Sequence, residues 1–80
     1  MATHKKIICG HTVVYEDDAK HGADYLSRDL DYEEAEVFFR HARARGKAKF
    51  EDDEDRNYTL KRNSNGTYTL IRRKSGGLFW

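Results

Sequence analysis

An 80-residue chain is long enough for one small domain, and its residues are 38% hydrophobic and 36% charged. The formal net charge of +1 excludes any argument from bulk charge for nucleic-acid binding. Cys9 is the single cysteine, so no disulfide can form within the chain, and this favours a reducing compartment.

The charge is unevenly distributed along the chain. Residues 1–36 contain four Lys or Arg and nine Asp or Glu, a net charge of −5. Residues 37–80 contain eleven and five, a net charge of +6. These opposite charges can attract each other within the fold or head to tail between two copies.

The N-terminal part contains only a short apolar run, residues 7–9. This run is too short for the hydrophobic region of a signal peptide or for a membrane span. We therefore expect a cytoplasmic protein without membrane contact.

Residues 5–15 predict strand structure, because β-branched and aromatic side chains flank an interruption at residues 9–12. Gly10 in this interruption indicates either a bulge or a small hairpin of residues 6–9 and 12–15. The segment is expected to complete the sheet, beside a strand that the sequence does not specify.

Residues 16–30 give weaker signals. The large apolar residues do not fall at helical spacing, and Gly22 lowers helix propensity. These apolar residues are Tyr25, Leu26 and Leu30. We predict a loop with one helical turn at residues 23–28.

Residues 32–45 predict an amphipathic helix. Asp31 and Glu34 have the spacing of a capping box, and Gly46 can take the left-handed conformation that ends a helix. One face carries apolar residues at i, i+3, i+4 and i+7. These residues are Tyr32, Ala35, Phe38, Phe39 and Ala42.

Three antiparallel strands are predicted after the helix, at residues 47–52, 57–62 and 67–72. A three-residue loop with Gly66 in a left-handed bulge pairs Leu60 with Leu70. The same register pairs Arg62 with Tyr68 and keeps the apolar side chains on one face.

The acidic run of residues 51–55 is predicted to be a solvated hairpin loop. It lacks the glycine and the spacing of a calcium-binding loop. A turn at residues 53–55 pairs Phe50 with Tyr58, so residues 47–52 extend the sheet and its apolar face.

These elements predict an α+β fold in a single domain, residues 1–80. One main helix packs on a three- to four-stranded antiparallel sheet, in the chain order β-α-β-β-β. Residues 74–80 form a flexible link with an apolar tip. The tip either folds back over the edge of the core or forms a partner interface, and its residues are Leu78, Phe79 and Trp80.

No catalytic, cofactor or metal site is expected. The potential zinc ligands lack paired spacing. They are His4, Cys9, His11, His21 and His41. A hydrolase with His11 or His41 as base and an arginine as phosphate clamp is a third-ranked hypothesis, because the sequence places no partner beside either histidine.

Basic residues on the helix end and on the outer sheet face are candidates for nucleic-acid contact. They are Arg40, Arg43, Lys47, Lys49, Lys61 and Arg73. The aromatic residues of the predicted strands lie on the other face, which disfavours base stacking.

The preferred function is a small non-catalytic protein-interaction or regulatory module. Its partner is another protein or a second copy, bound through the apolar tip or the N-terminal strand edge. The alternative is a nucleic-acid-binding protein that uses the basic sheet face and the helix-end arginines.

Overall fold

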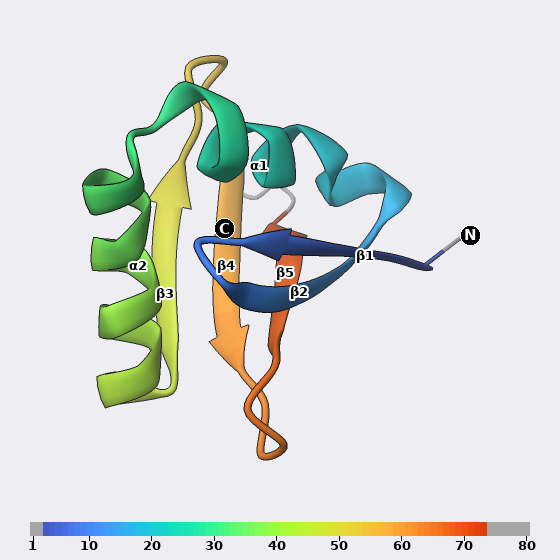
Figure 1. Ribbon diagram of the computed structural model, residues 1–80. Helices are drawn as coiled ribbons and strands as arrows, with labels where there is room; N and C mark the ends of the chain where they lie inside the picture. The colour runs from blue at the N-terminus through green and yellow to red at the C-terminus, as the bar shows by residue number, and fades with distance from the viewer. Residues whose placement is uncertain (1–2, 74–80) are drawn as a thin grey trace, which may run out of the picture.

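The computed structural model of the chain describes residues 3–73. Five strands form one mixed sheet in the order β1-β2-β5-β4-β3, and helical segments cover one of its faces (Figure 1). The elements are β1 (Thr3–Ile8), β2 (His11–Glu16), η1 (Asp17–Ala19), α1 (Lys20–Asp24), η2 (Tyr25–Asp29), α2 (Tyr32–Arg45), β3 (Lys47–Glu51), β4 (Asn57–Arg62) and β5 (Tyr68–Arg73). Among these residues, no helix is long and apolar enough to cross a membrane.

The β3-β4-β5 meander has the predicted register. Leu60 lies opposite Leu70, and Arg62 lies opposite Tyr68. Gly66 has a φ of 89°, and this left-handed residue closes the predicted three-residue loop. The apolar side chains of all three strands, except Ile71, are therefore buried on one face of the sheet.

Helix α2 has the predicted bounds and the predicted ends. The Asp31 N–H donates to Glu34 Oε1 at 3.0 Å, as a capping box requires. Gly46 has a φ of 93°, and its N–H donates to the Ala42 carbonyl at 2.7 Å. Tyr32 departs from the predicted apolar stripe, because its side chain is 64% exposed beyond the edge of the sheet.

The N-terminal segment is a hairpin, as the second alternative predicted, but its strands are residues 3–8 and 11–16 instead of 6–9 and 12–15. Cys9 and Gly10 both have positive φ, 53° and 79°, which is typical of a two-residue type I′ turn. Strand β2 then pairs with β5 in parallel, with Val13 opposite Tyr68.

The predicted three- to four-stranded antiparallel sheet is thus wrong in strand number and in one pairing. Parallel neighbours require a long crossover between them, and no local pattern reveals where a crossover returns. In Figure 1, β1 and β2 run across the direction of the other strands, so the sheet is strongly twisted.

Residues 17–29 are helical throughout, whereas the sequence predicted a loop with one turn. The buried residues of this segment are small, and they lie at i, i+3, i+4 and i+7. They are Ala19, Gly22, Ala23 and Leu26. The spacing was present in the sequence, but three of these four side chains are too small to register as an apolar stripe.

Gly22 allows α1 to approach β4 closely. A Cβ at this position would lie 2.7 Å from two ring carbons of Tyr58, which is itself fully buried. The Tyr58 ring also stacks on Phe50 with centroids 5.3 Å apart. The segment therefore contributes to the core through its backbone, which explains why large apolar residues are scarce there.

The acidic residues 51–55 are exposed, as predicted for a solvated loop, except Asp52, whose buried carboxylate organises the loop between β3 and β4. Asp52 accepts hydrogen bonds from the N–H groups of Glu54 and Arg56, from Arg56 Nε at 2.7 Å and from the Tyr58 hydroxyl. Burial raises the pKa of Asp52, but these hydrogen bonds outweigh burial and lower that pKa from 3.8 to about 2.

We expect Gly22→Ala to destabilise the fold by about 1–3 kcal/mol through overpacking against Tyr58. Helix propensity alone predicts the opposite sign, a gain of about 1 kcal/mol. Chemical denaturation measures the difference, and Lys20→Ala on the exposed side of α1 serves as control, with a change within about 0.5 kcal/mol. An alanine variant as stable as the wild type would contradict the close approach.

The Asp52 carboxylate should make stability depend on acid. Its pKa is lower in the folded chain than its ordinary value, so its contribution is complete above about pH 4 and is lost as the pH falls toward 2. The shift corresponds to about 2 kcal/mol. Asp52→Asn should lower the free energy of unfolding near pH 7 by a similar amount and flatten its decline between pH 4 and 2.

The exposed Asp53→Asn variant is the control, and it should retain the acid dependence. Denaturant titrations across this pH range measure the free energy of unfolding of both variants and of the wild type. Identical pH profiles for Asp52→Asn and the wild type would show that another group carries the acid dependence.

Candidate nucleic-acid interface

The face of the sheet opposite the helices carries a row of basic side chains. Lys47 and Lys61 are directly opposite each other on β3 and β4, and Lys49 follows two residues along β3. All three are exposed. Lys5 lies in the same cross-strand row, separated from Lys61 by Val14 and Thr69. We call this surface the basic face, formed by Lys5, Lys47, Lys49 and Lys61.

The lysines of the basic face lack carboxylate partners within the described chain. No Asp or Glu oxygen of residues 3–73 lies within 4.0 Å of their amines. By contrast, Lys6 points to the helix-covered face, where it pairs with Asp24 at 3.5 Å. Like charges directly opposite each other on neighbouring strands are destabilising, so the Lys47–Lys61 pair is unfavourable for the isolated protein.

The predicted set of basic residues is not one cluster. Arg73 lies opposite Asn57, four residues from the Lys61 partner along β5, which places it roughly 13 Å away. Its guanidinium donates to the Tyr58 carbonyl at 3.2 Å and 3.4 Å. Arg73 therefore lies at the acidic-loop end of the face that carries the lysines, two residues along β5 from Ile71 in the row of Lys49.

Arg40 and Arg43 lie on α2, exposed, on the helix-covered side of the molecule. They share a helical stripe with Glu36, at i+4 and i+7. The connection to the basic face comes from other side chains: Arg45 and His41 line a shallow pocket of about 330 Å³ with Lys47 and Lys49. Lys5 belongs to the basic face but was not predicted to do so, because the sequence did not place residues 5–15 beside any strand.

A second pocket, of about 360 Å³, opens where β2, the end of α2 and the β4–β5 loop meet. We call it the histidine pocket. Its lining includes His11, Arg43, Arg62, Asn63, Ser64, Gly66 and Tyr68. His11 has the partner that the sequence did not place, because its Nε2 lies 2.7 Å from Glu36 Oε1. His41, the other candidate base, is exposed on α2.

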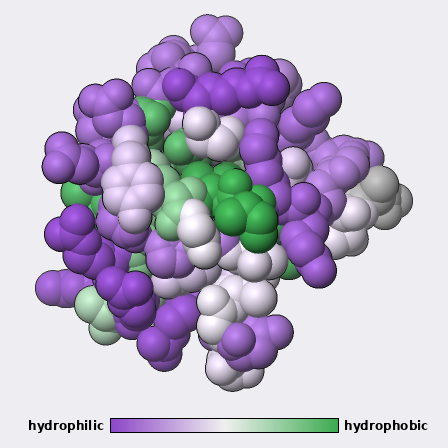
Figure 2. Space-filling view, in the orientation of Figure 1, coloured by the Kyte–Doolittle hydropathy of each residue, from purple (hydrophilic) through white to green (hydrophobic). Residues whose placement is uncertain are grey.

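An apolar patch lies on a different part of the surface, beside the β1–β2 hairpin. Figure 2 shows hydrophobic side chains gathered at the centre of the face seen in Figure 1. The patch surrounds a groove of about 200 Å³ lined by Ile7, Ile8, Cys9, Leu26, Ser27, Leu30 and Tyr32. Ile7 is 62% exposed at its rim. Burial, and then the charge of Glu36, raise the pKa of the Cys9 thiol, so it is protonated at neutral pH.

The potential metal ligands are dispersed in the described chain. No group of three or more His, Cys, Asp or Glu side chains in residues 3–73 is arranged to hold a metal ion. His4 contacts Asp17, and His11 contacts Glu36. The predicted interface residues of the C-terminal tip lie outside the described residues: Leu78, Phe79 and Trp80.

Comparison with known proteins adds no functional information. A scan against models of protein families, a search of curated proteins and a search of solved structures each find no match.

Proposed function

We propose that this protein binds nucleic acid through the basic face, by contacts to backbone phosphates. The observation that carries the proposal is the directly opposed pair Lys47 and Lys61, exposed and without a carboxylate partner in the described chain. A like-charge pair reduces the stability of the free protein, whereas a phosphate between the two amines turns repulsion into attraction.

The composition of the basic face favours backbone contacts over base readout. Its strands present mainly threonines and lysines, with the apolar residues Ile7, Val14 and Ile71 and with Glu16 and Glu51 at strand ends. No aromatic side chain of residues 3–73 points from this face. Stacking on unpaired bases needs aromatic groups. The expected ligand is therefore a duplex, bound without strong sequence preference.

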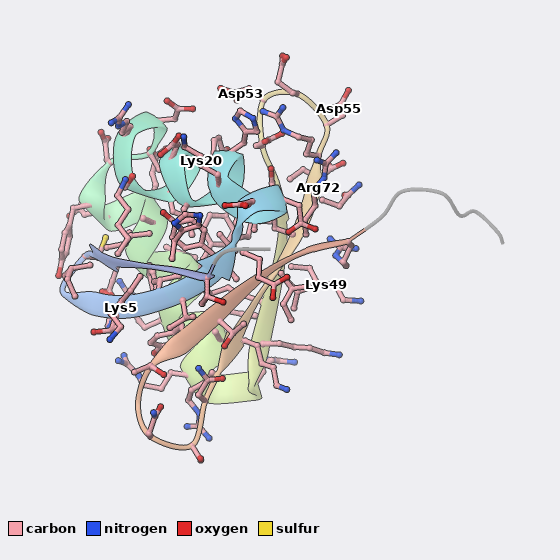
Figure 3. All side chains as sticks on the ribbon, turned by 90° about the vertical axis from the view of Figure 1, so that its right-hand side faces the viewer. Lys5, Lys20, Lys49, Asp53, Asp55 and Arg72 are labelled. Atoms are coloured by element: carbon pink, nitrogen blue, oxygen red, sulfur yellow. The ribbon has the colours of Figure 1, made fainter. Side chains whose placement is uncertain are left out.

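The acidic end of the molecule supports one binding orientation. In Figure 3, Asp53 and Asp55 lie at the top of the molecule on the β3–β4 loop, and Lys49 lies further down the same sheet. A polyanion is repelled from the loop and attracted to the lysines, so this separation of charge orients the protein on its ligand.

Charge reversal of the opposed pair tests the proposal. The double variant Lys47→Glu, Lys61→Glu should weaken binding to a 20-bp duplex by at least about ten-fold at low salt, because phosphate contacts are lost. Each lost contact should also reduce the slope of log affinity against log salt concentration by about 0.9. Fluorescence anisotropy at several salt concentrations measures both quantities.

A control with the same change of charge is Lys20→Glu, Arg28→Glu, since both residues are exposed on the helical segments at the acidic end. It should retain most of the affinity and the wild-type salt slope. Equal losses in the two double variants, or no binding of the wild type at low salt, would overturn the proposal.

A second candidate function is a non-catalytic protein-interaction or regulatory module that uses the apolar patch. The supporting observation is the exposure of Ile7 and Tyr32, 62% and 64%, on either side of one apolar groove. Lys5 and Lys6 on the edge strand β1 disfavour pairing through the strand edge itself. Contact through the side chains of the patch, with a second copy as partner, is the form of this candidate that can be tested directly.

If a second copy covers the patch, Ile7→Glu should shift a dimer to monomer in sedimentation velocity, because it places a charge in an apolar contact. Ile71→Glu is the control, since Ile71 is 45% exposed on β5 and lies outside the lining of the groove. A wild-type protein that sediments as a monomer at high concentration would contradict this form of the candidate.

A further inference from the structure

The histidine pocket is separate from the basic face. It lies on the helix-covered side of the sheet, between the first residue of β2, the last turns of α2 and the β4–β5 loop. Its volume of about 360 Å³ is within the range of about 300–1,000 Å³ that small-molecule sites occupy. Three basic side chains reach it from three different elements, namely His11, Arg43 and Arg62.

His11 is held in place by its neighbours and presents one nitrogen to solvent. Its ring stacks on Phe39 with centroids 4.4 Å apart, and Nε2 lies 2.7 Å from Glu36 Oε1. Nδ1 has no hydrogen bond within residues 3–73, and no buried side-chain nitrogen in that range lacks a partner. Nδ1 therefore reaches solvent, and the protonated ring can donate from it to a ligand.

The two arginines supply guanidinium donors, and that of Arg62 is held in place. Arg62 Nη1 donates to the Arg43 carbonyl at 3.2 Å, which holds the guanidinium against the end of α2. The other guanidinium N–H groups of Arg62 make no hydrogen bond within the described chain, and neither does the Arg43 side chain. No carboxylate of residues 3–73 lies within 4.0 Å of either guanidinium. Unpaired guanidinium forks match the geometry of phosphate oxygens.

The charges around the histidine pocket favour an anion. Glu36 is the acid beside it, and this carboxylate is already paired with His11. The carbonyl end of α2 contributes the equivalent of about half a negative charge, which two guanidinium groups outweigh. The three donor groups lie on three elements, so they can approach an anion from three directions.

We propose that the histidine pocket binds a phosphate monoester, with Arg43, Arg62 and His11 each donating to one of its free oxygens. A monoester has three such oxygens, whereas a phosphodiester or a carboxylate has two. The ester is either the terminal phosphate of a nucleic acid or a free phosphate compound, because both present the same group.

The test uses the full chain, isotope-labelled, with inorganic phosphate as the first probe. NMR signals of the His11 ring and of the Arg43 and Arg62 side chains should shift and saturate. Arg43→Gln and Arg62→Gln should each weaken this binding by about ten-fold or more, because a hydrogen bond to a charged group is lost. Arg40→Gln, one turn earlier on α2 and outside the pocket lining, should leave it unchanged.

Arg62→Gln also removes the hydrogen bond to the Arg43 carbonyl. If Arg62→Gln has a lower melting temperature than the wild type, Arg43→Gln is the decisive variant. Absence of saturable shifts, or equal weakening by Arg40→Gln, would overturn the proposal. The Lys47→Glu, Lys61→Glu double variant should bind inorganic phosphate as tightly as the wild type. Loss of duplex binding by the basic face can therefore be distinguished from loss of phosphate binding by the histidine pocket.

A duplex with and without a 5′-phosphate then identifies the source of the group. Tighter binding of the phosphorylated duplex, lost in Arg43→Gln, assigns the histidine pocket to nucleic-acid ends. Equal affinities of the two duplexes, together with saturable binding of inorganic phosphate, assign it to a free phosphate compound.

Discussion

The parallel pairing of β2 with β5 is the constraint on which the rest of the structure depends. It joins the N-terminal hairpin to the meander and places Val13 beside Tyr68 in the core. It also brings His11 to Glu36 and Lys5 into the row of Lys61, although these residues are far apart in the chain. A sheet without this pairing would have neither the histidine pocket nor the full basic face.

Some charged groups of the described chain have partners of opposite charge within it, and others have none. Asp52 in the acidic loop is buried and fully hydrogen-bonded, and His4 and His11 each contact a carboxylate. The lysines of the basic face and the arginines of the histidine pocket have no carboxylate partners in residues 3–73. Among the lysines and arginines of residues 3–73, only Lys6 and Arg56 pair with a carboxylate of this range. The basic face and the histidine pocket are two places where several of the other cations lie together, which favours an anionic ligand there.

The candidate sites were only partly predictable. Lys47, Lys49 and Lys61 follow from strand alternation and hairpin register, which are local patterns. Alternation also places Arg73 on this face, although it does not give the distance of Arg73 from Lys61 along the sheet. The partner of His11 lies 25 residues away on α2, so no spacing in the sequence indicates it.

The sequence by itself determined α2, its two ends, and the register of β3, β4 and β5, because capping residues, turn glycines and side-chain alternation act over a few neighbouring residues. The tertiary structure alone decided the parallel strand pairing and the helical state of residues 17–29. In that segment, Gly22 disfavours a helix locally and is required by the fold, because only a residue without a Cβ allows the backbone to approach Tyr58. Packing between distant segments outweighs local propensity there.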